Sequence, residues 1–241
     1  MHPISLPRLA FTILLMLLPA TSWAQQRPAI AVQMAKIYGI DSFAKVEAIR
    51  YTFNAEFGTA RLARSWVWSP KADTVTYAGP DKTGKPVTAT YARSQLGSQS
   101  DVVQNEVDPA FWNDQYWLVF PFHVIWDTNA TVTDDAMQPL PSGKGSGRRL
   151  VVKYPSDGGY QPGDTWEIFL GGNKRIVELA YHRGGDTPPK LVTATWTDYK
   201  RAGPFLFSTD HRGAADGKPL HIFLTDVAVK MVGSKAWIPA K

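Results

Sequence analysis

The stretch from Val46 to Phe57, with the sequence VEAIRYTFNAEF, decides the fold. Its apolar side chains fall at every second position: Ile49, Tyr51, Phe53, Ala55 and Phe57. Successive side chains of a strand point to opposite faces, so this alternation places one face against a core and leaves the other in water. Such a division is typical of an antiparallel sheet. We therefore predict a half-buried antiparallel strand over these residues.

Similar short segments follow this strand, and turns rich in Gly, Pro and Asp separate them. Strands are predicted at 62–68, 73–77, 87–91, 150–154, 166–170, 175–182, 191–199, 204–209 and 220–231. Many short strands with few helices indicate an antiparallel α+β fold. We expect a single domain over residues 25–241, without internal repeats or a long linker.

Two segments carry helical patterns. Residues 29–38 place apolar side chains at spacings of four and three, and Gly39 would end that helix. A second helix is predicted over about 109–118, with Asp108 as its N-cap. This helix should stop before Pro121, because a proline ring disfavours the helical conformation of the residue ahead of it.

The chain after this second helix has two further features. The alternation over 120–126 predicts an extended segment, and residues 128–146 form a polar loop that is the best candidate for a mobile flap. Aromatic residues also crowd the helix and the segment after it: Trp112, Tyr116, Trp117, Phe120, Phe122 and Trp126. This cluster either fills the core or forms a lid over a cavity for an apolar ligand, since ligand pockets are mostly apolar with a few placed polar groups.

The N-terminus has the organisation of a secretory signal peptide over residues 1–24. Arg8 supplies positive charge, residues 9–19 are almost purely apolar, and Ser22 and Ala24 are the small residues before a cleavage site. A membrane anchor is the alternative, but this run is too short to cross a hydrocarbon core of roughly 30 Å. We expect cleavage after Ala24 and export to the periplasm.

The composition excludes several functions. The chain has no Cys, so disulfides and thiolate chemistry are excluded. Its net charge of +5 is small and scattered, whereas a nucleic-acid partner requires a concentrated basic stripe. The nine Trp are more than an ordinary core needs, and they favour a wide apolar cavity or an interface.

The sequence offers little support for catalysis. The histidines outside the signal are His123, His182, His211 and His221, and none belongs to a recognised metal motif. We interpret His182 and His221 as structural, and Asp210-His211 as a weak candidate for a base or ligand. No Gly-x-Ser-x-Gly motif is present, and the run GKGSG at 143–147 precedes a strand instead of opening a helix. We therefore predict no catalytic residue, no metal site and no cofactor.

The order of these elements resembles the LolA/LolB-like superfamily of bacterial periplasmic lipoprotein carriers. Residues 66–70 (WVWSP) and 74–77 (TVTY) look like the strand-Pro-strand hairpin of the carriers. Residues 175–179, 196–199 and 203–205 are similar to the closing strands of related proteins. The resemblance implies an α+β fold: an antiparallel incomplete β-barrel, or half-barrel, of about ten strands covered by two or three helices. The carriers place an arginine after the hairpin proline to hold their closed form, and this chain has Asp-Thr-Val there.

The resemblance implies a periplasmic binding protein, not an enzyme, that holds a lipid, an acyl chain or another apolar ligand. The residues expected to line its cavity are Tyr51, Phe53, Trp66, Trp68, Tyr91, Trp117, Phe122, Trp126 and Trp196. We expect a monomer whose further partners are a lipoprotein or a membrane surface, with no nucleic acid. Two alternatives stay open: a secreted hydrolase with a His/carboxylate site, and a non-catalytic envelope interaction module.

Overall fold

The computed structural model describes residues 26–185 and 190–241, so the predicted signal peptide lies outside the described residues. The helices are α1 (Ala29–Tyr38) and α2 (Asp108–Trp126), and the strands are β1 (Val46–Phe57), β2 (Ala60–Ser69), β3 (Thr74–Pro80), β4 (Pro86–Ala92), β5 (Thr131–Pro139), β6 (Ser146–Lys153), β7 (Thr165–Leu170), β8 (Ile176–His182), β9 (Leu191–Thr195), β10 (Thr197–Ala202), β11 (Phe205–Ala215), β12 (Lys218–Met231) and β13 (Trp237–Pro239). In the described part, no helix is both long and apolar enough to cross a membrane.

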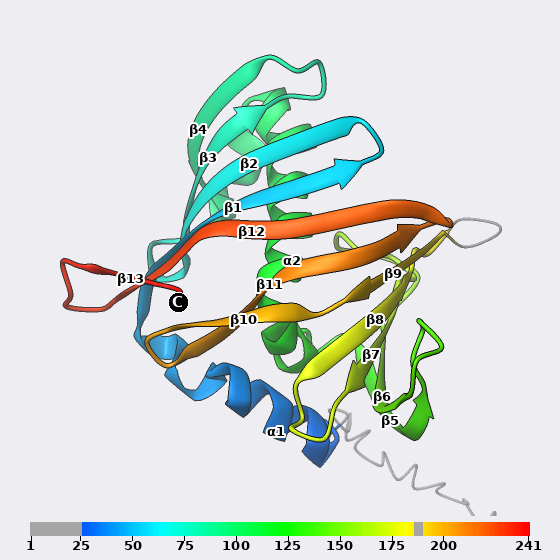
Figure 1. Ribbon diagram of the computed structural model, residues 1–241. Helices are drawn as coiled ribbons and strands as arrows, with labels where there is room; N and C mark the ends of the chain where they lie inside the picture. Colours follow the sequence, from blue (N-terminus) through cyan, green and yellow to red (C-terminus); the bar gives the residue numbers. More distant parts are fainter. Residues whose placement is uncertain (1–25, 186–189) are drawn as a thin grey trace, which may run out of the picture.

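The described strands form one large antiparallel sheet that does not close into a barrel. The order of its main path is β4-β3-β2-β1-β12-β11-β9-β8-β7-β6-β5. Figure 1 shows the sheet curving around α2, with α1 lying across one end. The predicted class, an open antiparallel α+β half-barrel, is confirmed, although the described residues hold thirteen strands instead of about ten.

Strand β1, whose alternation is the clearest in the sequence, is an interior strand of this sheet. It pairs with β2 on one side and with β12 on the other, and Phe53 stands opposite Arg64 and Leu224. Four of its five predicted inner side chains, Ile49, Tyr51, Phe53 and Ala55, are buried, whereas Phe57 at the end of the strand is exposed. The alternation therefore identified both the strand and the face that it turns toward the core.

The second helix is longer than predicted, because α2 continues through Pro121 to Trp126. The helix is interrupted at Val119, whose backbone has φ −120° and ψ 19°. Pro121 then lies in the first turn of the second helical piece, where a backbone N–H is not needed. The extended segment predicted for 120–126 is therefore wrong. Asp108 is not the N-cap either, because its backbone is already helical (φ −68°, ψ −40°); its carboxylate accepts hydrogen bonds from Tyr91, Arg93 and Tyr160 instead.

Two other predicted segments differ from the structure. The loop predicted at 128–146 contains β5, which pairs with β6 and carries a bulge between Asp134 and Met137. Polar side chains on an edge strand can resemble a loop, because only one of its faces needs apolar residues. The strand predicted at 191–199 divides at Trp196 into β9 and β10, which both pair with β11.

Helix α1 is tied to the sheet by a buried hydroxyl. The Tyr38 and Tyr199 hydroxyl groups lie 2.6 Å apart, and the Tyr38 oxygen accepts the Ile176 N–H at 3.0 Å. The Tyr199 hydroxyl in turn donates to the Ile176 carbonyl at 2.6 Å. These bonds connect α1 to β8 and β10, so the helix closes one end of the half-barrel.

Gly213 permits the close approach of β9 and β11. A Cβ at this position would lie 1.8 Å from the Thr193 carbonyl oxygen. We expect Gly213→Ala to lower the free energy of unfolding by about 1–3 kcal/mol, because the two strands would have to separate. Urea unfolding followed by circular dichroism measures this loss. The control is Gly172→Ala, whose added Cβ meets nothing within 4 Å, and an equal effect of both variants would contradict the prediction.

Candidate functional site

A cavity of about 280 Å³ lies between the inner face of the sheet and the first half of α2. The alternation of β1 places Phe53, Ala55 and Phe57 along one of its walls. Its remaining lining comes from β2, α2, the segment before β7, and strands β7, β8, β9 and β12: Leu62, Arg64, Pro109, Trp112, Asn113, Tyr116, Trp117, Tyr160, Gln161, Asp164, Trp166, Tyr181, Val192, Leu220 and Ile222. The wall is mostly aromatic and aliphatic, which suits an apolar ligand.

Two of the residues expected to line a cavity, Phe53 and Trp117, do line this one. The others lie outside it: Tyr51, Trp66, Trp68, Tyr91, Phe122, Trp126 and Trp196. Trp66, for example, packs on Tyr77 at a ring distance of 4.5 Å. Tyr51 and Trp66 border a separate, more open hollow of about 460 Å³, and the other five residues pack in the core around α2. Contact of any of these residues with a ligand remains a prediction.

The sequence patterns did not predict most of the far wall of the cavity. Trp166, Tyr181, Leu220 and Ile222 come from strands that were predicted, but no pattern showed which of their faces points inward. Where both faces of a strand carry apolar residues, alternation separates the two faces but does not show which of them faces the cavity. Trp112 and Tyr116 belong to the predicted aromatic cluster, whose alternative role as a cavity wall holds for these two residues.

One charged pair lies at the cavity wall. Asp114 on α2 is fully buried and accepts hydrogen bonds from Arg64 Nε at 2.7 Å, from Arg64 Nη2, from Trp66 Nε1 at 2.9 Å and from Asn113 Nδ2 at 3.0 Å. Burial raises the pKa of Asp114 to about 6, against the opposing effect of the Arg64 charge and hydrogen bonds. The carboxylate is therefore ionised at neutral pH and bound to Arg64.

A second polar cluster fixes the C-terminal end of α2. The Asp127 carboxylate accepts hydrogen bonds from the hydroxyl groups of Tyr116 and Tyr154, and it lies 3.1 Å from His123 Nδ1. Burial alone would raise the pKa of Asp127, but these hydrogen bonds outweigh it and lower the pKa. His123 is buried between Tyr116 and two tryptophans, and its Nε2 has no partner among the described residues. The cluster anchors the helix and offers no accessible base.

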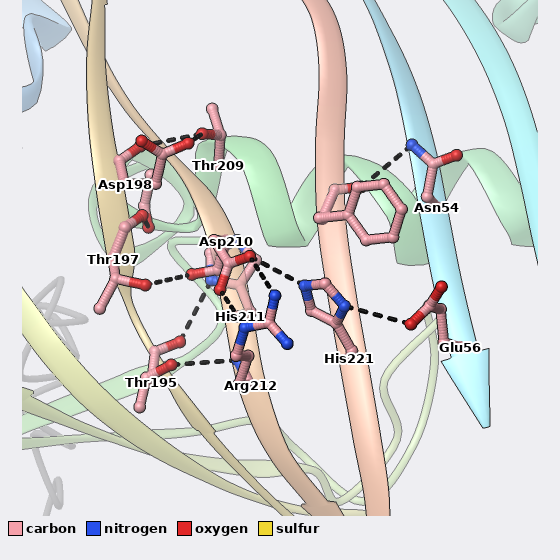
Figure 2. A network of polar contacts seen from close by, with 12 residues as sticks. Asn54, Glu56, Thr195, Thr197, Asp198, Thr209, Asp210, His211, Arg212 and His221 are labelled. Carbon is pink, nitrogen blue, oxygen red and sulfur yellow. Dashed lines mark hydrogen bonds and ion pairs between the residues drawn. The ribbon is translucent and has the colours of Figure 1, made fainter. Parts of the chain in front are cut away.

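A histidine between two carboxylates lies on the outer face of the sheet (Figure 2). His221 Nε2 is 2.8 Å from Asp210, and its Nδ1 is 3.3 Å from Glu56. These side chains lie on β12, β11 and β1, and a shallow hollow of about 330 Å³ opens beside Glu56 and His221. Both ring nitrogens face a carboxylate, and no described hydroxyl group bonds to the ring. We interpret the trio as a cross-strand brace, in keeping with the structural role predicted for His221.

The other histidines also belong to the packing of the sheet. Adjacent strand residues point to opposite faces, as predicted for Asp210 and His211, and His211 is fully buried against Trp117 and Trp196. His182 lies 3.5 Å from Glu167 at the end of β8. Within the described residues, no group of three His, Cys, Asp or Glu side chains has the arrangement to hold a metal ion.

Two solved structures are similar to this chain. A DUF1329 family protein from Desulfovibrio piger is 10% identical with a TM-score of 0.46, and the match covers 86% of this chain and 92% of that one. The lipoprotein LppX of Mycobacterium tuberculosis is 7% identical with a TM-score of 0.32, covering 84% and 96% respectively. No protein-family model and no curated protein matches the chain. The likeness concerns the arrangement of elements alone, and membership of the LolA/LolB-like superfamily stays a prediction.

Proposed function

We propose that this protein is an exported binding protein that holds one apolar chain in the cavity between α2 and the sheet. The observation that carries the proposal is the cavity itself: about 280 Å³, with a mainly aromatic and aliphatic wall, between α2 and the sheet. Burying each methylene group of a ligand contributes about 0.8 kcal/mol. A chain with several methylenes can therefore be bound without a strong polar contact.

The size of the cavity limits the ligand. Its volume equals that of about nine water molecules in the liquid, so it accepts one short chain and not a lipid with several long ones. The mouth carries two exposed aromatic residues, Phe57 at 47% and Tyr160 at 39% exposure. Their position supports entry of an apolar ligand at this end. The expected signal peptide over 1–24 supports binding in the periplasm, with a lipoprotein or a membrane surface as the source of the ligand.

The proposal predicts that a bulky side chain in the cavity abolishes binding. Val192 on β9 is partly buried and lines the cavity, so Val192→Trp would fill it. We expect at least about a tenfold loss of affinity for a naphthylamine fluorescent probe, because the probe loses most of its buried contact. A fluorescence titration measures this loss.

The matched control for this variant is Val177→Trp on β8, since Val177 does not line the cavity. It should bind the probe as the unmodified protein does. Equal binding by both variants, with their folds verified by circular dichroism, would place the binding site elsewhere. Absence of probe binding by the unmodified protein would count against the proposed function.

A further inference from the structure

The polar groups on the cavity wall are few, and most are already used. Besides the apolar residues, the charged and amide side chains of the lining are Arg64, Asn113, Gln161 and Asp164. Asp164 accepts hydrogen bonds from the Tyr181 hydroxyl and from the Gly184 N–H, both at 2.8 Å. It precedes β7, on the far side of the half-barrel from β2, which carries Arg64. The two ends of the cavity wall therefore differ in charge.

Arg64 keeps part of its guanidinium group free. Its Nε and Nη2 donate to the two oxygens of Asp114, and its Nη1 has no hydrogen-bond partner among the described residues. The side chain is 17% exposed, and the guanidinium carbon lies 5.1 Å from the centre of the Phe53 ring. Phe53 stands opposite Arg64 in the sheet and lines the cavity with it. Residues opposite each other in an antiparallel pair share a face, so Arg64 points to the inner side.

Asp114 cannot take up the remaining donors. Its two oxygens already accept the four hydrogen bonds from Arg64, Trp66 and Asn113. A guanidinium group has five N–H donors, and an arginine can bridge two oxyanions through different edges. The free N–H groups therefore suit a second oxyanion, for which a charge-assisted hydrogen bond is stronger than a neutral one.

We propose that the ligand is an anionic amphiphile: a single apolar chain that ends in a carboxylate or a phosphate monoester, with this end bound by Arg64 Nη1. The inference rests on the proposed function, because it names the class of ligand for the same cavity. The chain contacts the aromatic wall, and the charged end lies beside β2, away from Asp164. An uncharged alcohol of the same length makes the same apolar contacts but loses the charge-assisted hydrogen bond.

Calorimetric titration with three ligands of one chain length tests the inference. Octanoate, octyl phosphate and octanol are compared at pH 8, below the micelle concentrations of the two anions and the solubility limit of the alcohol. We expect at least one anion to bind about tenfold more tightly than the alcohol. The anion that binds more tightly identifies the carboxylate or the phosphate as the preferred end group.

Two variants link this preference to Arg64. The double variant Arg64→Gln, Asp114→Asn removes both charges together, so no charge is left buried alone, and it should bind anion and alcohol equally. The single variant Asp114→Asn releases Arg64 from its partner and should strengthen the preference for the anion. The stronger anion preference expected for Asp114→Asn keeps the inference testable even if the double variant does not fold. A loss of stability would not produce tighter binding of the anion.

The possible failures are distinguishable. If none of the three ligands binds the unmodified protein, the proposed function itself is wrong. If octanol binds as tightly as both anions, the cavity is a ligand site but the inferred anionic end group is wrong. A preference for the anion that persists in the folded double variant would also overturn the role of Arg64.

Discussion

Replacing Arg64 by alanine will lower the free energy of unfolding by about 3–5 kcal/mol, because it leaves a buried carboxylate without its counter-ion. Asp114 is fully buried, and Arg64 supplies two of its hydrogen bonds and its only described cationic partner. Chemical unfolding at pH 8 measures the loss. The matched control is Arg148→Ala, which breaks a more exposed ion pair with Asp134 and should change stability by about 0–1 kcal/mol.

The pH dependence gives this prediction a second readout. The pKa of Asp114 is raised to about 6 in the folded protein, above its ordinary value of 3.8. The Asp114 carboxyl therefore binds a proton more tightly in the folded protein than in the unfolded chain. Its contribution to the free energy of unfolding is most favourable below pH 4 and declines as the pH rises to 6. In Arg64→Ala the pKa of this acid is raised further, and the variant should recover stability at pH 5. A defect that is equally large at pH 5 and pH 8 would contradict the role of the unpaired charge.

The buried His211 should make the protein sensitive to acid. Burial lowers the pKa of His211 from 6.5 to about 3, and the hydrogen bond from its Nδ1 to the Thr195 carbonyl opposes this only in part. A histidine with a lowered pKa in the folded protein contributes fully to the free energy of unfolding above pH 6.5. This contribution is lost as the pH falls toward 3, because the histidine is protonated in the unfolded chain before it is protonated in the folded protein. Between pH 7 and pH 4.5 the loss from this residue is about 3 kcal/mol.

His211→Asn tests this prediction, since its amide group can still donate to the Thr195 carbonyl and does not titrate. The variant should lose less stability between pH 7 and pH 4.5 than the unmodified protein does, as thermal unfolding at several pH values would show. The control is His182→Asn, which replaces a histidine at a partly exposed position. Parallel pH profiles for His211→Asn and the unmodified protein would count against the prediction.

The sequence predicts most of the sheet, because most of its strands carry a local signal; β5 and β13 were not predicted. Alternation over β1 gives the strand, its buried face and the antiparallel class. Alternation fails over the second half of α2, which it predicted as an extended segment. The proline rule correctly indicates a break there, but it does not predict the second helical piece. The backbone does leave the helical region at Val119, and the chain then resumes a helix that is buried on all sides. A segment buried all round has no polar face, so its period cannot distinguish helix from strand.

The site was harder to predict than the sheet, because it is formed by residues far apart in the chain. Phe53 and Trp117 were expected in the cavity wall, but nothing local connects Arg64 with Asp114, which lies 50 positions away. The pattern of β2 placed Arg64 beside Trp66 on one face without giving a reason for a charge there. Only the packing of α2 against β2 brings the carboxylate to the guanidinium group.

The pairing of β1 with β12 determines when this chain can fold. Val46 pairs with Met231, so β1 cannot complete its pairing until β12, near the end of the chain, is available. Closing a loop of this length is slow compared with forming the local β1–β2 hairpin. A chain that ends before Lys218 would hold two separate half-sheets with unpaired edges at β1 and β11, and open edges recruit strands from other chains. We therefore expect chains that end before β12 to aggregate more readily than the full chain, and the β1–β12 pairing to form after the local hairpins.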